Sequence, residues 1–262
     1  MKNLFVALLL LLGTFGSNCS NKPMEGKLEE ESHSPTKPTN IAPTESSFQA
    51  FKAHNGVTFS YLKLLPEQYQ SNKAYPAMLV FPAMEQHSEK ADWIAEKLFI
   101  SGHNRDWIVI VVDAPKDRKY GWMNHPAHHA LNDLMDQIKK DHLIEKDRFH
   151  FLGFEEGSRP AFSFAGMSRS YVQSLSFVGV KDWGELDDKG FDRAEGLDMP
   201  IVIYANGKET ELVAKTKEIE KELKHRKTAI HLMIQEGDTK ALESLQAGGL
   251  LAKASTVLGT PK

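Results

Sequence analysis

Residues 153–157 (GFEEG) place a glutamate between two glycines, after an apolar run and before a stretch with helical spacing. Where a strand enters a helix through so tight a turn, the central side chain points into the crevice at the sheet edge. The carboxylate of Glu155 could act there as a nucleophile or contact a ligand or metal. It could also do no more than accept hydrogen bonds from the N-terminus of the following helix, whose dipole favours negative charge.

Residues 122–131 (WMNHPAHHAL) contain three histidines that would follow a neighbouring strand. Imidazole nitrogens and carboxylates are ligands that Zn²⁺ accepts, so His125, His128 and His129 are candidate metal ligands together with Glu155. Neighbouring residues of a helix point about 100° apart, which makes a site that uses both His128 and His129 difficult. We therefore expect polar histidines here, and no cofactor or metal.

Two tryptophans, Trp122 and Trp183, fall in segments expected to line the same crevice. Their rings could stack on a ligand, and we take them, with His125 and His128, as candidate ligand contacts. The alternative is that a tryptophan in such a loop covers the hydrophobic core. The sequence leaves both roles open.

Strands and helices alternate along the chain from about residue 48. The inner strands are continuous apolar runs, which is typical of parallel strands buried on both faces. We expect strands over residues 57–65, 77–82, 106–115, 148–153, 174–180, 200–207 and 228–235, and helices over residues 88–101, 126–141, 158–167, 210–226 and 239–258. This pattern predicts one α/β domain, residues 48–262, with a mostly parallel central sheet and helices on both faces. Ligands of such sheets bind beyond the carboxyl ends of the strands, where Glu155 would lie.

The segment 143–157 (LIEKDRFHFLGFEEG) resembles the strand and nucleophile elbow of secreted α/β hydrolases of the feruloyl-esterase and polyhydroxybutyrate-depolymerase type. The order of elements extends the resemblance over residues 57–260. It implies a single α/β-hydrolase-like domain with a serine nucleophile at the elbow. It also implies an acid after residues 200–205 and a histidine base after residues 228–234.

The catalytic residues that this resemblance implies are largely replaced. Glu155 stands at the serine position, and a Pro-Ala pair at 82–83 stands where the family has the His-Gly motif of its oxyanion hole. Glu209 or Glu211 could lie near the acid position. No histidine follows His231, which we expect inside the last strand rather than in the loop beyond it. The family's catalytic triad is therefore degenerate in this chain.

Loss of the histidine removes the base that the family's mechanism needs, and turnover should fall by several powers of ten. Glutamate is also one methylene longer than the aspartate that some α/β hydrolases use as a nucleophile, and a misplacement of about 1 Å can cost on the order of 100-fold. We therefore predict a non-catalytic protein that binds an unidentified ligand or protein in the crevice. The alternatives are an esterase or other hydrolase that works through Glu155 or a metal, and a structural surface protein.

The N-terminus predicts export and attachment to a membrane. Residues 1–18 combine an early lysine with a short apolar run, as a signal peptide does, and Cys19 follows as a candidate lipidation site. Residues 19–47 are rich in Pro, Ser, Thr and Glu and predict a disordered tether. We expect a bacterial lipoprotein outside the cytoplasm, on the cell membrane or outer membrane, or otherwise a secreted or periplasmic protein. The net charge of −3, without a basic run, argues against nucleic acid as a partner.

Overall fold

The computed structural model of the chain describes residues 48–82, 91, 94, 107–115, 121–123, 125–180, 199–225 and 230–235. Within these ranges the elements are β1 (Gln49–Lys52), β2 (Thr58–Leu64), β3 (Tyr75–Phe81), β4 (Ile108–Val112), η2 (Gly121–Met123), α2 (His125–Asp141), β5 (Ile144–Phe154), η3 (Glu155–Gly157), α3 (Ser158–Met167), η4 (Arg169–Tyr171), β6 (Val172–Val178), β7 (Ile201–Asn206), α5 (Thr210–His225) and β8 (Ile230–Gln235). The predicted signal peptide and tether lie outside the described residues, as do Cys19 and Trp183. No helix of the described ranges is long and apolar enough to cross a membrane.

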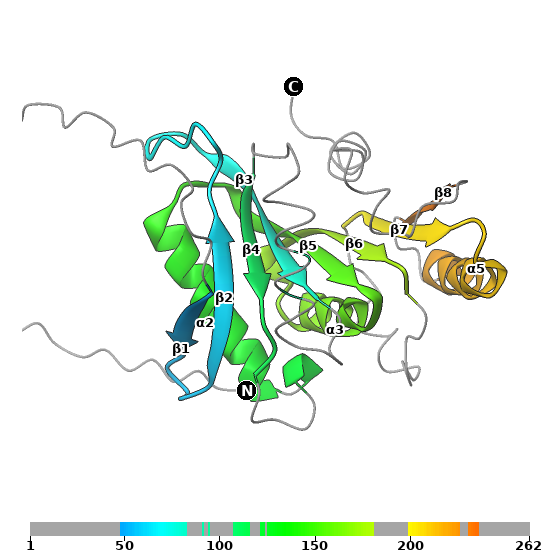
Figure 1. The fold of residues 1–262 in the computed structure, drawn as a ribbon, viewed down its shortest axis with the longest axis horizontal. Coiled ribbons are helices and arrows are strands. Elements are labelled where there is room, and N and C mark those ends of the chain that lie inside the picture. The colour runs from blue at the N-terminus through cyan, green and yellow to red at the C-terminus, as the bar shows by residue number, and fades with distance from the viewer. Residues whose placement is uncertain are drawn as a thin grey trace, which may run out of the picture. The chain divides into compact units, whose positions relative to one another are not determined.

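The strands form one mixed sheet in the order β1-β2-β4-β3-β5-β6-β7-β8, which Figure 1 shows from blue β1 to orange β8. The six strands from β4 to β8 along this order are all parallel. β1 and β2 are antiparallel to their neighbours. The sequence-based prediction of a mostly parallel sheet in a single α/β domain is therefore confirmed.

β1 is the one described strand that the sequence pattern did not predict. It has only four residues, most of them exposed, so it carries no apolar run or clear alternation. It forms because a tight turn brings it back onto β2: the Ala53 N–H donates to the Val57 carbonyl at 2.9 Å, and the Gly56 N–H to the Ala53 carbonyl at 2.9 Å. Gly56 has a φ of 79°, a left-handed conformation that glycine adopts without a steric cost.

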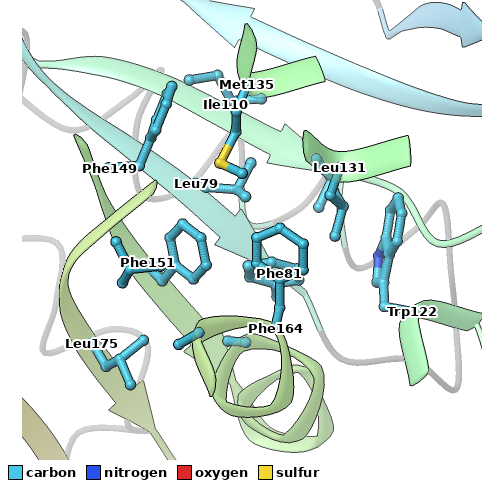
Figure 2. Packing of buried hydrophobic residues seen from close by; sticks show 14 of the residues in the cluster. Leu79, Phe81, Ile110, Trp122, Leu131, Met135, Phe149, Phe151, Phe164 and Leu175 are labelled. Atoms are coloured by element: carbon cyan, nitrogen blue, oxygen red, sulfur yellow. The ribbon is translucent and has the colours of Figure 1, made fainter. Parts of the chain in front are cut away.

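The core lies in two layers, one on each face of the sheet. Because side chains alternate along a strand, Leu79 and Phe81 of β3 pack in one layer, while Met78 and Val80 pack in the other. Helices α2, α3 and α5 cover the first layer, part of which Figure 2 shows. The helical residues Ala91 and Ile94 pack in the second layer. Burial on both faces is the reason that β4 consists of apolar residues throughout.

β5 begins with a bulge that the sequence pattern did not reveal. Tyr75 pairs with Ile144 and Ala77 with Phe149, so the β5 side of the ladder holds three more residues than the β3 side. Lys146 and Asp147 absorb the difference with φ values of 56° and 54°. Beyond the bulge the strand is fully buried and runs straight to the elbow segment.

Candidate functional site

The candidate site is the turn between β5 and α3, where the chain leaves the carboxyl end of the central strand. Glu155, the first residue of η3, has a φ of 45°. A non-glycine residue rarely adopts this conformation, which costs on the order of 1–3 kcal/mol and persists only where surrounding contacts enforce it. The turn therefore has the strained central residue of a nucleophile elbow, and this residue is a glutamate.

Both glycines of this segment are needed because their surroundings leave no room for a side chain. A Cβ at Gly153 would overlap the backbone of Ser158, and one at Gly157 would overlap the carbonyl oxygen of Phe81. The same Cβ at Gly157 would lie 2.5 Å from the carbonyl oxygen of Pro82. The start of α3 therefore excludes a side chain at Gly153, and the end of β3 excludes one at Gly157.

The side chain of Glu155 passes over the end of the next strand. Gly179 follows β6 with a φ of 65°, and a Cβ at this glycine would lie 3.6 Å from Cγ of Glu155. Both Glu155 and the following Glu156 are half-buried. Oε2 of Glu156 has no hydrogen-bond partner among the described residues. The elbow thus holds two carboxylates at the carboxyl edge of the sheet, where α/β proteins bind their ligands.

Ser158, which directly follows the elbow, is buried. It is 0% exposed, and it lies beneath the turn against the backbone of Gly153. The turn therefore shields this hydroxyl from solvent. Its Oγ has no hydrogen-bond partner within the described part of the chain.

The acid candidates lie after β7, as expected, and both are exposed. Glu209 precedes α5, and its carbonyl accepts a hydrogen bond from the Val213 N–H at 2.9 Å. Glu211 lies in the first turn of α5, where its side chain is 86% exposed and its carboxylate is 3.4 Å from Nζ of Lys215. Glu211 therefore forms an ion pair with Lys215 of the same helix.

His231 lies inside β8, where the sequence placed it. It pairs with Val202 near the start of both strands, whereas Gln235 and Asn206 form the pair at the carboxyl end. Four residues of strand separate His231 from that end, a distance of about 13 Å. Its backbone is therefore far from the edge at which the elbow lies.

Helix α2 separates the three candidate histidines. The rings of His125 and His129 are 4.4 Å apart, and both residues are exposed. His128 points the other way, is 5% exposed, and packs edge-on against Phe164 of α3 at 5.4 Å. The structure thus places the ring of His128, a suggested crevice ligand, in the core between two helices. Within the described ranges no group of three or more His, Cys, Asp or Glu residues could hold a metal ion.

Trp122, suggested as a ligand contact, is buried in the core. The residue is 1% exposed and belongs to the first core layer. Its indole lies edge-on to Phe59 at 4.8 Å and to Phe81 at 6.5 Å. Figure 2 shows it at the end of a row of buried aromatic rings that includes Phe81. The loop that holds Trp122 therefore covers the core, which was the alternative that the sequence had left open.

Two buried polar residues were not singled out in the sequence. Asp113 follows β4 at the carboxyl edge, is 4% exposed, and is positioned by a hydrogen bond from its N–H to the Ser60 carbonyl at 2.8 Å. An acidic residue directly after an apolar strand was the signal that could have identified it. His150 lies in β5, with Nδ1 2.5 Å from Oγ of Ser174 and its ring 4.7 Å from that of Trp107. Burial, together with the charge of Lys146, lowers the pKa of His150 to about 4.

Three solved structures with the same fold are hydrolases by their descriptions. The chain is similar to a dienelactone hydrolase from Anabaena variabilis, with a TM-score of 0.55 and 16% identity over 81% of this chain and 95% of that one. It is similar to esterase 2 of Thermogutta terrifontis, with a TM-score of 0.58 and 12% identity over 84% and 99% of the two chains. A ferulic acid esterase matches with a TM-score of 0.56 and 10% identity over 81% and 97%.

No family model matches the sequence, and no curated protein is similar to it in sequence. The class of protein is therefore defined by its fold. The strand order, the antiparallel second strand and the elbow after β5 are those of the α/β hydrolases, and this chain has the α/β-hydrolase fold.

Proposed function

We propose that this protein is a non-catalytic member of the α/β-hydrolase fold that binds a ligand or a partner in the crevice above its elbow. The observation that carries the proposal is the strained elbow with Glu155 at its centre. The φ of 45° and the two glycines without room for a Cβ maintain a costly turn. A turn of this kind holds one side chain toward the crevice, and here that side chain is a carboxylate.

The chemistry of the family argues against turnover. Acyl transfer through an elbow needs a nucleophile, a histidine that takes its proton, and an acid that orients the histidine. The chain has no histidine after His231, and Ser158 is buried. A crevice lined by Glu155 favours ligands that present hydrogen-bond donors or a positive charge, because a carboxylate only accepts hydrogen bonds.

The first test measures hydrolysis of a panel of p-nitrophenyl esters by the purified full chain. Glu155→Gln and Glu155→Ala, purified in the same way, and a mock preparation are the controls. Rates equal to the mock preparation in all three proteins support the proposal. A wild-type rate that both substitutions remove would overturn it and make Glu155 a catalytic carboxylate. A rate that all three proteins share above the mock would overturn it too, and would place the catalytic group elsewhere.

A second measurement looks for binding directly. A ligand that binds the folded protein raises the midpoint of thermal unfolding in proportion to the logarithm of its concentration above Kd. We expect a screen of amine-containing and hydrogen-bond-donating compounds to yield ligands that stabilise the wild type and not Glu155→Gln. Ligands that stabilise both proteins equally would show that the carboxylate is not part of the site.

An active hydrolase with an altered apparatus is the second candidate function, and the strained elbow is the observation that favours it, since strain is often maintained at catalytic residues. The ester assay separates the two. A purely structural surface protein would tolerate substitution of Glu155 without any loss of cellular function.

The N-terminal segment supports a proposed location outside the cytoplasm. We infer that residues 1–18 are removed and that Cys19 carries the lipid, because the cysteine directly follows a signal-like segment. Metabolic labelling with a fatty acid should label the wild type in the membrane fraction and leave Cys19→Ser unlabelled. Equal labelling of both would contradict the assignment of Cys19.

A further inference from the structure

The edge of the sheet opposite the elbow carries the exposed apolar side chains of the described residues. This amino edge is formed by the starts of the parallel strands and by the segments that lead into them. The large hydrophobic residues that are exposed in the described part of the chain are Leu65 (37%), Leu143 (50%) and Met167 (39%). All three lie at the amino edge, although they are far apart in sequence.

The topology places each of them there. Leu65 follows β2, whose last residue pairs with Val109 near the start of β4. Leu143 precedes β5, and its carbonyl accepts a hydrogen bond at 3.0 Å from the N–H of Tyr75, the first residue of β3. Met167 ends α3, which begins at the elbow and returns the chain to the start of β6. Apolar side chains gathered on one side of a protein mark a surface of interaction.

Basic and aromatic residues lie between these apolar side chains. Segments 63–75, 139–148 and 167–171 contain seven basic and four acidic residues, whereas the chain as a whole has a net charge of −3. The basic residues are Lys63, Lys73, Lys139, Lys140, Lys146, Arg148 and Arg169, of which Lys139 is 3.6 Å from Asp136.

The half-buried Tyr69 occupies the middle of this edge. Its hydroxyl is 2.7 Å from Nδ1 of His142, and Nε2 of the same ring is 3.1 Å from Nζ of Lys63. The ring of Tyr69 also packs at 5.3 Å from that of Tyr75, with Lys73 above the latter. Exposed leucines among lysines and tyrosines are the composition of surfaces that lie in the headgroup region of an anionic membrane.

We propose that the amino edge rests on the surface of an anionic lipid bilayer, with Leu65, Leu143 and Met167 in the headgroup region. The crevice, at the opposite edge, then faces away from the membrane and is open to a ligand or partner. This orientation is independent of what the crevice binds.

A fluorescent label at single positions tests the proposal. In the full chain, Cys19→Ser removes the only cysteine, so that a second substitution to cysteine can carry an environment-sensitive NBD group. Leu143→Cys places the label at the amino edge. Glu211→Cys is the matched control, since its side chain is 86% exposed in the first turn of α5, beyond the carboxyl end of β7. The vesicles contain phosphatidylglycerol and phosphatidylethanolamine.

On these vesicles we expect the fluorescence of the label at 143 to increase severalfold and its emission maximum to shift to shorter wavelength. Both changes should be smaller at high salt or on vesicles of phosphatidylcholine alone. The fluorescence of the label at 211 should not change, because this position should remain exposed to water. Equal spectra at the two positions would overturn the proposal, even if the N-terminal segment alone binds the vesicles. A shift at 143 that needs protein concentration and not lipid would also overturn it, and would indicate that a second copy covers this edge.

A substitution without any label completes the test. Leu65→Ser and Leu143→Ser, combined in the full chain, remove exposed side chains and should leave the unfolding midpoint unchanged. We expect vesicle binding of a Cys19→Ser chain to fall severalfold when these substitutions are added. An unchanged bound fraction, in a protein with an unchanged midpoint, would contradict a role of the two leucines at the membrane.

Discussion

Gly157 of the elbow lies so close to the carbonyl oxygen of Phe81 that no Cβ fits between them. This contact joins the turn after β5 to the end of β3, the two places that build an active site in enzymes of this fold. It is present in a chain whose elbow carries Glu155 at its centre. The position of the Glu155 carboxylate therefore depends on a contact between two strand ends.

Gly157→Ala should lower the free energy of unfolding by about 2 kcal/mol or more, since overpacking against backbone cannot be relieved by a rotamer change. Urea denaturation measures the loss. The matched control is Gly56→Ala: Gly56 also lies in a turn, but a Cβ at this position would meet no atom within 4 Å. There only the φ of 79° is unfavourable, with a cost of about 1 kcal/mol. Equal losses in the two variants would show that the elbow is not tightly packed.

Because the backbone is strained at Glu155, the usual order of stability of an alanine and a glycine variant should be reversed at this position. Alanine at 155 must keep the φ of 45°, whereas glycine adopts it freely, so Glu155→Gly should be more stable than Glu155→Ala by about 1 kcal/mol. At the exposed Lys217 of α5 the order should be the usual one, with alanine more stable than glycine by about 1 kcal/mol. Urea denaturation of the four variants checks both orders. The same order at both positions would contradict the strained turn.

The buried His150 should lower the free energy of unfolding in mild acid. Its pKa is about 4 in the folded chain, below the ordinary 6.5, so between these values the unfolded chain binds a proton that the folded chain does not. Stability is thus fully present above pH 6.5 and is lost as the pH falls toward 4. From pH 7 to pH 5 this residue should account for about 2 kcal/mol.

The measurement is urea denaturation of the wild type and of His150→Gln at pH 7 and pH 5. Glutamine does not titrate and can still form a hydrogen bond with Oγ of Ser174. The wild type should lose about 2 kcal/mol more than the variant between the two pH values. Parallel losses would show that His150 is protonated in the folded protein already at pH 5.

Substitution of the buried Trp122 should cause a large loss of stability and have no direct effect on ligand binding. Trp122→Ala would leave a cavity beside Phe59 and Phe81 and should cost about 3–5 kcal/mol. Trp122→Phe keeps an aromatic ring and should cost less. Chemical denaturation gives both values. If instead Trp122→Phe keeps full stability and weakens a crevice ligand found by thermal screening, the core position of Trp122 is contradicted.

Much of the fold could be predicted from local pattern. The apolar runs of β3, β4 and β7 are buried on both faces of the sheet, as is typical of parallel strands that are covered by helices on both sides. What the pattern did not reveal are β1 and the bulge at residues 145–148. Both depend on hydrogen bonds to another strand and carry no apolar signal of their own.

The candidate site, like the fold, could be predicted from the sequence only in part. The spacing of Gly153, Glu155 and Gly157 predicted the elbow, because only a glycine on either side fits a turn so close to its neighbours. The roles of Trp122 and His128 were not predictable, since a polar-looking loop or helix start can turn a ring inward or outward. Their burial depends on Phe59, Phe81 and Phe164, which come from other parts of the chain.

The sequence by itself determined which chemical groups are available: a carboxylate at the turn, no serine there, and no histidine after His231. Folding cannot supply a group that the chain does not contain. Only the tertiary structure decided where the available groups point, which of them are buried, and that the exposed leucines share the edge opposite the elbow. Those properties arise from contacts between segments distant in sequence, where packing and not local preference selects the environment of each side chain.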